Sequence, residues 1–234
     1  ISAATQAKIK FALSPELKGL LTNPSVSPSQ VPVCVVGFEN VGKTELVNTW
    51  YRTTAHYFPR FDAEETAPAL PDDERDKTSG ISIKSFTLPY KREGLWSRTS
   101  VNIAAWDFSG HAEYYVSHEV MMQACRDAVF IALIRIDRVH PVAQRKAETE
   151  RLFFWLKFIA TACVNQQRPP TIFIGGSFRP DNDYDVEATT TWTDAVLQNA
   201  KDVFGDVLNL QQHNIYHMDC RKHQDPPVVE LRNA

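Results

Sequence analysis

Three features that would assign a sequence quickly to a class of protein are missing here. The longest apolar run, near residues 128–134, is far too short to span a bilayer. There is no basic excess, because 25 Lys and Arg stand against 28 Asp and Glu, for a net charge of -3. The chain therefore offers no basic surface for nucleic acid. It also lacks a polybasic run that would bind an anionic membrane. We expect neither nucleic acid as a partner nor direct membrane insertion.

Cysteine is scarce and scattered. The four cysteines are Cys34, Cys125, Cys163 and Cys220, and no pair has metal-ligand spacing. This pattern argues against zinc and favours buried thiols in a reducing compartment, so we expect a cytoplasmic location. The chain starts with Ile1 and shows no signal peptide, and we expect it to be a piece of a longer protein.

The composition does support an ordinary hydrophobic core. Hydrophobic residues make up 43% of the chain and charged residues 23%, which excludes wholesale disorder. The first boundary is a segment rich in proline and serine at residues 23–29, which we interpret as a linker. We expect residues 1–30, with a short helix at 6–21, to be a lead-in or the tail of a preceding domain. Residues 31–234 would then form one domain.

Within residues 31–234, strand and helix patterns alternate. The expected strands are residues 31–36, 81–88, 101–108, 128–136, 171–174 and 215–218. The expected helices are residues 43–51, 112–124, 142–164 and 192–207. This order predicts an α/β fold with a mostly parallel six-stranded sheet covered on both faces, and the polar segment 91–100 allows one antiparallel edge strand. Only residues 226–234 follow the last strand, so we expect a truncated final helix.

A phosphate-binding motif follows the first expected strand. Gly37-Phe38-Glu39-Asn40-Val41-Gly42-Lys43-Thr44 fits G-x-x-x-x-G-K-[ST] and precedes a helix, as the motif demands. Its glycines let the backbone curl so that N–H groups face a β-phosphate. Lys43 would bridge the β- and γ-phosphates, and Thr44 would place its hydroxyl on Mg²⁺. The predicted nucleotide-binding residues here are Gly37, Asn40, Val41, Gly42, Lys43, Thr44 and Glu45.

Two further elements have the order expected of nucleotide switches. Trp106-Asp107-Phe108-Ser109-Gly110-His111 contains D-x-x-G at the end of the expected strand 101–108. Asp107 would reach Mg²⁺ through water, and the Gly110 N–H would sense the γ-phosphate because only glycine allows that close approach. Before the expected strand 81–88 lies Arg75-Asp76-Lys77-Thr78-Ser79-Gly80-Ile81, where Thr78 is placed to bind Mg²⁺ when a γ-phosphate is present.

Together, these elements resemble a small G domain. Residues 106–110 followed by Glu113-Tyr114-Tyr115, and the helix through residues 147–159, resemble the Roc domains of Roco proteins. The resemblance covers most of residues 31–221. It implies a P-loop, Ras-like G domain, GTP and GDP as ligands, Mg²⁺ as cofactor and a role in signalling. It also implies a parent chain with repeat and COR-like domains, and homodimers.

Two residues are candidates for catalysis beside Lys43. Residues 75–81 resemble the R-x-[KR]-T-x-G-I stretch of heterotrimeric G-protein alpha subunits, in which the arginine is a catalytic finger. Carried over by position, Arg75 would be that finger. His111 stands where Ras-like enzymes usually have glutamine and where translational GTPases carry histidine. A neutral imidazole can accept a hydrogen bond from the attacking water. The alternative for both Arg75 and His111 is a surface residue without a catalytic role.

The base-reading motif departs from the family pattern. Ras-like proteins use N-K-x-D, and Roc domains often T-H-x-D, in which the carboxylate accepts from guanine N1–H and N2–H₂. After the expected strand 171–174 the chain has Gly175-Gly176-Ser177-Phe178-Arg179-Pro180-Asp181. Ser177 and Phe178 could take the first two places, with Phe178 stacked on the base and Asp181 one residue late. The last base contact would fall near Cys220 and Arg221, through backbone N–H groups.

Three functions stay open on this sequence. The first is a GTP-hydrolysing switch, in which GTP and Mg²⁺ order the loops around Thr78 and Gly110 and hydrolysis releases them. The second is a degenerate pseudo-GTPase that acts as a nucleotide-regulated or nucleotide-free interaction scaffold, which the weak base motif favours. The third is an ATP-dependent P-loop enzyme, since the phosphate loop does not read the base. The D-x-x-G and T-x-G-I elements argue against the third.

Overall fold

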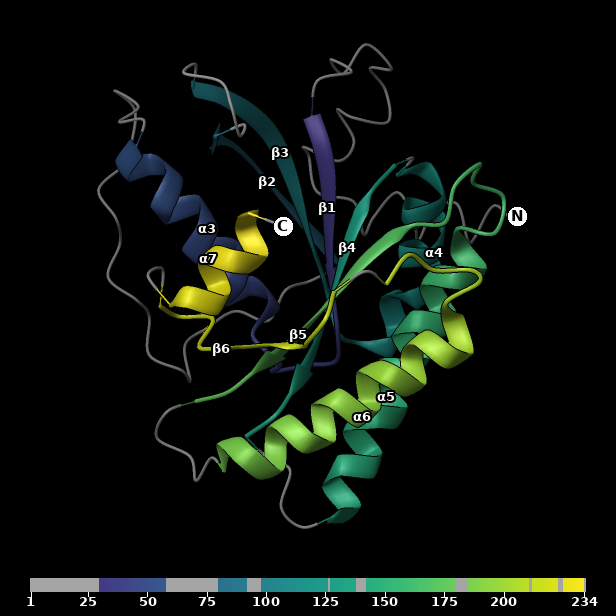
Figure 1. Ribbon diagram of the computed structural model, residues 1–234. Helices are drawn as coiled ribbons and strands as arrows, with labels where there is room; N and C mark the ends of the chain where they lie inside the picture. Colours follow the sequence, from purple (N-terminus) through teal and green to yellow (C-terminus); the bar gives the residue numbers. More distant parts are fainter. Residues whose placement is uncertain are drawn as a thin grey trace.

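A six-stranded sheet forms the centre of the molecule (Figure 1). The computed structural model describes residues 30–57, 80–91, 98–125, 127–137, 142–179, 185–210, 212–222 and 225–233. The strands are β1 (Gln30–Val36), β2 (Ile81–Lys91), β3 (Arg98–Phe108), β4 (Val129–Arg135), β5 (Thr171–Ser177) and β6 (Tyr216–Met218). They lie in the order β2-β3-β1-β4-β5-β6.

The strand pairing is parallel except at one edge. β1 pairs in parallel with both β3 and β4, and β4–β5 and β5–β6 are also parallel. The edge pair β2–β3 is antiparallel. The central strand β1 is apolar on both faces, with Cys34, Val35 and Val36 fully buried, as a strand covered on both sides requires. The predicted α/β class is confirmed, and this topology is consistent with a P-loop, Ras-like domain.

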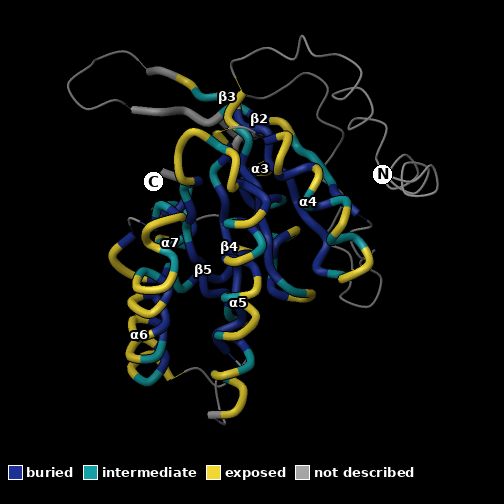
Figure 2. Tube along the Cα trace, turned by 90° about the vertical axis from the view of Figure 1, so that its right-hand side faces the viewer, coloured by how far each residue is buried: buried dark blue, intermediate teal, exposed yellow. Residues whose placement is uncertain are grey.

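Helices cover both faces of the sheet. In Figure 1, α3 (Lys43–Tyr57) and α7 (Pro226–Asn233) lie on one side, and α4 (Tyr115–Ala124), α5 (Val142–Ala162) and α6 (Val186–Phe204) on the other. A short 3-10 turn, η1 (Ala112–Tyr114), leads into α4. Figure 2 shows the buried strands between helices whose outer turns are exposed. None of the described helices is long and apolar enough to cross a membrane.

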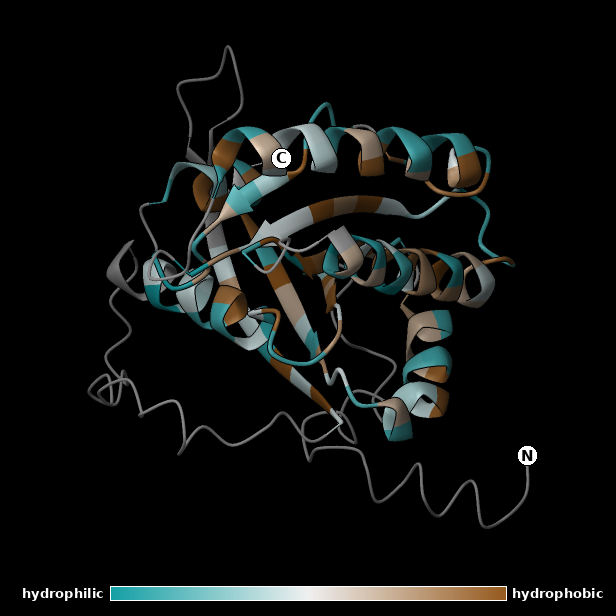
Figure 3. Cartoon of the chain, turned by 90° about the horizontal axis from the view of Figure 1, so that it is seen from below, coloured by the Kyte–Doolittle hydropathy of each residue, from teal (hydrophilic) through white to brown (hydrophobic). Residues whose placement is uncertain are grey.

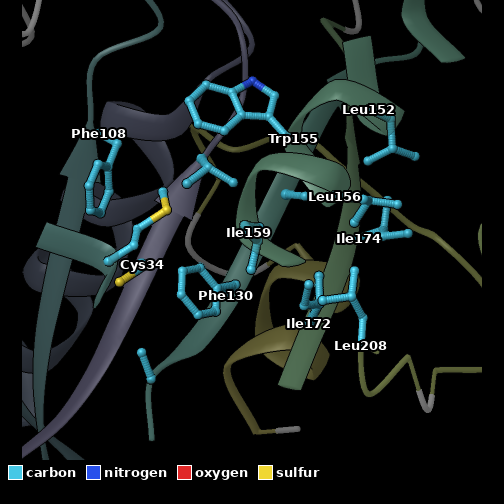
Figure 4. Close-up of a cluster of buried hydrophobic side chains, with 14 of the residues drawn as sticks. Cys34, Phe108, Phe130, Leu152, Trp155, Leu156, Ile159, Ile172, Ile174 and Leu208 are labelled. Atoms are coloured by element: carbon cyan, nitrogen blue, oxygen red, sulfur yellow. The ribbon is translucent and has the colours of Figure 1, made fainter. Parts of the chain in front are cut away.

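Among the described residues, the larger of two hydrophobic clusters lies between the sheet and α5. Trp155, Leu156 and Ile159 of α5 are buried, and Figure 4 shows Ile159 beside Phe130 of β4 and Leu156 beside Ile174 of β5. Their spacing gives the apolar stripe that a helix needs in order to pack on a sheet. Apolar residues also gather along the strands in Figure 3. Burial of this surface supplies the main stabilising term of the fold.

The ends of several elements differ from the expectation. α6 starts at Val186, earlier than expected, because the Asp185 side chain accepts a hydrogen bond from the Ala188 N–H at 3.0 Å and caps the helix. The expected helix 112–124 divides into η1 and α4. The tail forms α7. The expected helix 6–21 and linker 23–29 lie outside the described residues. All four cysteines are buried and free of disulfides.

Candidate nucleotide-binding site

The phosphate-loop motif forms the tight turn between β1 and α3. Gly37, Asn40 and Gly42 have φ angles of 147°, 60° and 92°, which glycine adopts readily and asparagine more readily than most other residues. Space also demands glycine at position 37, where a Cβ atom would lie 2.6 Å from the Leu133 carbonyl oxygen and 2.9 Å from the Val41 side chain. The loop therefore has the sharp curl that the motif predicts.

Thr44 and Asp107 meet at the mouth of this loop. The Thr44 hydroxyl donates a hydrogen bond to Asp107 Oδ2 at 2.6 Å. The contact forms because β3 lies beside β1, with Asp107 in register with Val35, so the carboxylate reaches the edge where the loop begins. A hydroxyl and a carboxylate are oxygen ligands of the kind that Mg²⁺ prefers. These two residues fit the predicted ion, which usually keeps several waters and takes further ligands from phosphates.

Lys43 is a buried cation at the start of α3. Its side chain is folded back over the loop, and its Nζ donates to the Phe38 carbonyl oxygen at 2.7 Å. Burial lowers the pKa of Lys43 to about 8, although Asp107 and Glu39 oppose that shift. A buried ammonium is costly unless an anion lies near it. The site is therefore suited to an anionic ligand.

The glycine of D-x-x-G packs directly on the phosphate loop. A Cβ atom at Gly110 would lie 2.4 Å from the Glu39 backbone nitrogen and 2.6 Å from the Phe38 carbonyl carbon, so no side chain fits there. The Gly110 carbonyl accepts a hydrogen bond from the Tyr115 hydroxyl of α4 at 3.3 Å. A shift of Gly110 would therefore be transmitted both to the loop and to α4.

His111 faces the phosphate loop through Glu39. Its Nδ1 lies 2.9 Å from Glu39 Oε1, and the two side chains are 29% and 42% exposed. If Nδ1 carries the proton in this pair, the second ring nitrogen, Nε2, presents a lone pair. No sequence signal marks Glu39 as a functional residue, because the phosphate-loop motif accepts any residue at that position.

Val41 and Glu45 complete the loop and the first turn of α3. Val41 is buried in the smaller core cluster. The Glu45 carboxylate lies 3.9 Å from the Arg52 guanidinium on the same helix. Their side chains thus serve the fold, and we expect only their backbone N–H groups to reach a ligand.

The carboxyl ends of β5 and β6 point in the same direction as the carboxyl end of β1, where the phosphate loop begins. Ser177 is buried, and its hydroxyl donates to the Ile134 carbonyl oxygen at 3.4 Å. Phe178 packs against the larger core, and its N–H donates to the Met218 carbonyl oxygen at 3.1 Å. Cys220 is buried beside the phosphate loop, since a Cβ atom on Gly42 would lie 3.3 Å from its sulfur.

Arg221 is held by a neighbouring carboxylate. Its backbone N–H donates to Asp219 Oδ1 at 3.2 Å, and its guanidinium pairs with the same side chain at 3.0 Å. Asp219 itself is buried. The N–H that we expected to serve the base oxygen therefore already has an acceptor, with which a base would compete.

The sheet thus brings most of the predicted site residues to one edge. β1, β3, β5 and β6 run in the same direction, so the segments that follow them converge at their carboxyl ends. The strand ends contribute Asp107 and Ser177, and the segments that follow contain Gly37, Asn40, Val41, Gly42, Lys43, Thr44, Glu45, Gly110, His111, Phe178, Cys220 and Arg221. Arg75, Thr78 and Asp181 lie outside the described residues, and their roles stay predictions.

This chain is similar to a solved structure but matches no family model and no curated protein. Among solved structures, the chain is similar to the RocCORdC structure of Roco2 from Methanosarcina barkeri, bound to GDP. The match has a TM-score of 0.46 and 16% sequence identity, and covers 87% of this chain and 46% of that one. The chain thus spans slightly less than half the length of that structure.

Proposed function

We propose that this domain is a GTP-binding molecular switch that hydrolyses GTP to GDP with Mg²⁺. The observation that carries the proposal is the contact between Thr44 and Asp107 at the mouth of the phosphate loop. A phosphate loop alone suits many nucleotide-binding proteins. In this protein Asp107 of D-x-x-G contacts the loop threonine, and Gly110 packs on the loop backbone. This arrangement favours a switch.

The backbone N–H groups of the phosphate loop and the ammonium group of Lys43 would bind the phosphates. That ammonium group would exchange the Phe38 carbonyl for phosphate oxygens, a charge-assisted contact that is stronger than the one it replaces. Thr44 and Asp107, with Thr78 as a further predicted ligand, would hold Mg²⁺. The ion would neutralise charge on the phosphates.

Hydrolysis would depend on His111 and Glu39. The Glu39 carboxylate would hold the proton on His111 Nδ1, so that Nε2 could accept a hydrogen bond from the attacking water. Lys43 and the loop N–H groups would stabilise the charge that develops on the γ-phosphate. Arg75 remains the predicted arginine finger, and Asp181 the predicted reader of guanine.

The direct test is nucleotide binding. Denaturing the purified protein and identifying any released nucleotide by chromatography shows what it carries. Titration with fluorescent GTP, GDP and ATP should then give tighter binding of both guanine nucleotides than of ATP. Equal affinity for GTP and ATP would overturn the guanine assignment, and no binding of any of them would overturn the switch.

The surroundings of the domain are part of the proposal. We place it in the cytoplasm, as the Roc-like domain of a longer signalling chain with COR-like and repeat domains, and we expect homodimers. Light scattering after size-exclusion chromatography, with GDP and with a non-hydrolysable GTP analogue, measures the oligomeric state. A monomer in both states would contradict the dimer.

A second candidate is a pseudo-GTPase that acts as a scaffold. The observation in its favour is the base side of the site, where Phe178 packs on the core and the Arg221 N–H is bonded to Asp219. A folded protein that releases no nucleotide on denaturation and binds none in titrations would favour this function over the switch.

A further inference from the structure

A buried ion pair at the end of β4 belongs to none of the sequence motifs. Arg135 donates from Nε and Nη2 to the two carboxylate oxygens of Asp137, at 2.5 Å and 2.7 Å. The two side chains are only 8% and 0% exposed. Such a pair adds little net stability to a fold, because the desolvation of both charges offsets their attraction. Its other contacts point to a different role.

The pair joins two loops of the candidate site. Arg135 Nη1 donates to the Asn40 carbonyl oxygen at 3.1 Å, within the phosphate loop. Asp137 Oδ2 accepts a hydrogen bond from the Arg179 N–H at 3.0 Å, in the loop that follows β5. One ion pair therefore links the loop predicted to bind phosphates with the loop predicted to read the base.

The contact at Asn40 fixes a peptide plane beside a residue in the left-handed backbone region. Asn40 has a φ angle of 60°, which costs energy for any residue other than glycine. Its carbonyl oxygen is held on the Arg135 side of the loop. Because a trans peptide is planar, the Val41 N–H points in the opposite direction, away from Arg135. Loss of the guanidinium would free this peptide to rotate.

We propose that Arg135 is a positioning residue for nucleotide binding, which holds the phosphate loop at Asn40 in its binding conformation and is itself oriented by Asp137. The proposal rests on the proposed function and deepens it. Because Arg135 contacts the phosphate loop at Asn40, its loss should weaken binding of guanine and adenine nucleotides by the same factor.

The test needs a variant that does not leave a lone buried charge. Arg135→Met alone would strand the Asp137 carboxylate, which is strongly destabilising. The double variant Arg135→Met with Asp137→Asn removes both charges and keeps an amide oxygen that can accept from the Arg179 N–H. Lys201→Met is the matched control, since it removes a 2.7 Å contact from a cation to the Gln212 carbonyl oxygen without touching the phosphate loop.

The main measurement is the release rate of fluorescent GDP, with the unfolding temperature as the structural readout. We expect the double variant to release GDP at least about tenfold faster than the wild type. The ratio of GDP to ADP affinity should stay unchanged. Arg135→Lys should give an intermediate rate, and Lys201→Met a wild-type rate. An unchanged release rate with a lower unfolding temperature would make the pair purely structural and overturn the proposal.

A second measurement separates this proposal from the proposed function. If the wild type binds no nucleotide, the switch fails, but the contact at Asn40 still predicts faster amide hydrogen exchange at residues 40–44 in the nucleotide-free double variant. If residues 40–44 of the double variant exchange their amide hydrogens at the wild-type rate, the positioning role is overturned, whatever the protein binds.

Discussion

The Thr44 hydroxyl donates to the Asp107 carboxylate at 2.6 Å, across 63 positions of sequence. If this pair holds Mg²⁺, Thr44→Val and Asp107→Asn should each weaken GDP binding at least about tenfold in the presence of Mg²⁺. Without the ion, both variants should bind GDP like the wild type. Titration with fluorescent GDP, with and without EDTA, makes the comparison. Thr53→Val is the matched control, since the Thr53 hydroxyl contacts the Thr49 carbonyl oxygen instead.

Lys43 illustrates a conflict between binding and stability. Its ammonium is buried, and burial disfavours the charged form. Lys43→Met should abolish nucleotide binding and raise the unfolding temperature of the nucleotide-free protein by roughly 2–5 °C. Thermal unfolding with and without GDP measures both effects, and Lys157→Met on an exposed turn of α5 is the control. A Lys43→Met protein with wild-type GDP affinity would contradict the phosphate-loop assignment.

Glu39 and His111 should act as one unit in hydrolysis. We expect His111→Ala and Glu39→Ala each to slow single-turnover GTP hydrolysis about tenfold or more, with GTP affinity little changed. The double variant should be no slower than the worse single variant, because each loss removes the same function. Faster hydrolysis in Glu39→Ala would instead mean that Glu39 restrains His111.

Buried His118 should make the fold sensitive to acid. It lies among Phe108, Tyr115 and Trp155. Burial lowers its pKa from 6.5 to about 4, although a hydrogen bond to the Gly80 carbonyl oxygen acts to raise it. Between these two pH values the unfolded chain binds the proton more readily than the folded chain does. Stability should therefore fall as the pH falls from 6.5 to 4, by on the order of 3 kcal/mol.

Unfolding temperatures measured across that range test the role of His118. His118→Phe should reduce the acid-induced loss, because phenylalanine has no proton to gain. His213→Gln, at an exposed position, should leave the loss as in the wild type. If the His118→Phe protein loses as much stability in acid as the wild type does, other groups cause the effect.

The interiors of the helices and strands and the phosphate loop could be predicted from the order of residues alone. Apolar runs such as residues 31–36 and the stripe that includes Leu156 and Ile159 on α5 have the periods of a buried strand and a helix, and those periods are local properties. The glycines at positions 37 and 42 are likewise required by the local path of the backbone. These features could be predicted because neighbouring residues decide them.

Helix ends were harder to predict than helix interiors. The early start of α6 depends on a single hydrogen bond from the Ala188 N–H to the Asp185 side chain. Aspartate suits both helix caps and loops, so its presence before residue 192 did not by itself fix the boundary.

The residue pairs that complete the site depend on how the strands assemble. The guanidinium of Arg135 reaches the Asn40 carbonyl across 95 positions of sequence, and Glu39 meets His111 from a different strand end. No period or spacing encodes such contacts. They exist because the sheet order places β1 between β3 and β4, so that the segments following these three strands meet at one edge. A sequence fixes local periodicity residue by residue, whereas contacts between strand ends depend on how the whole sheet pairs.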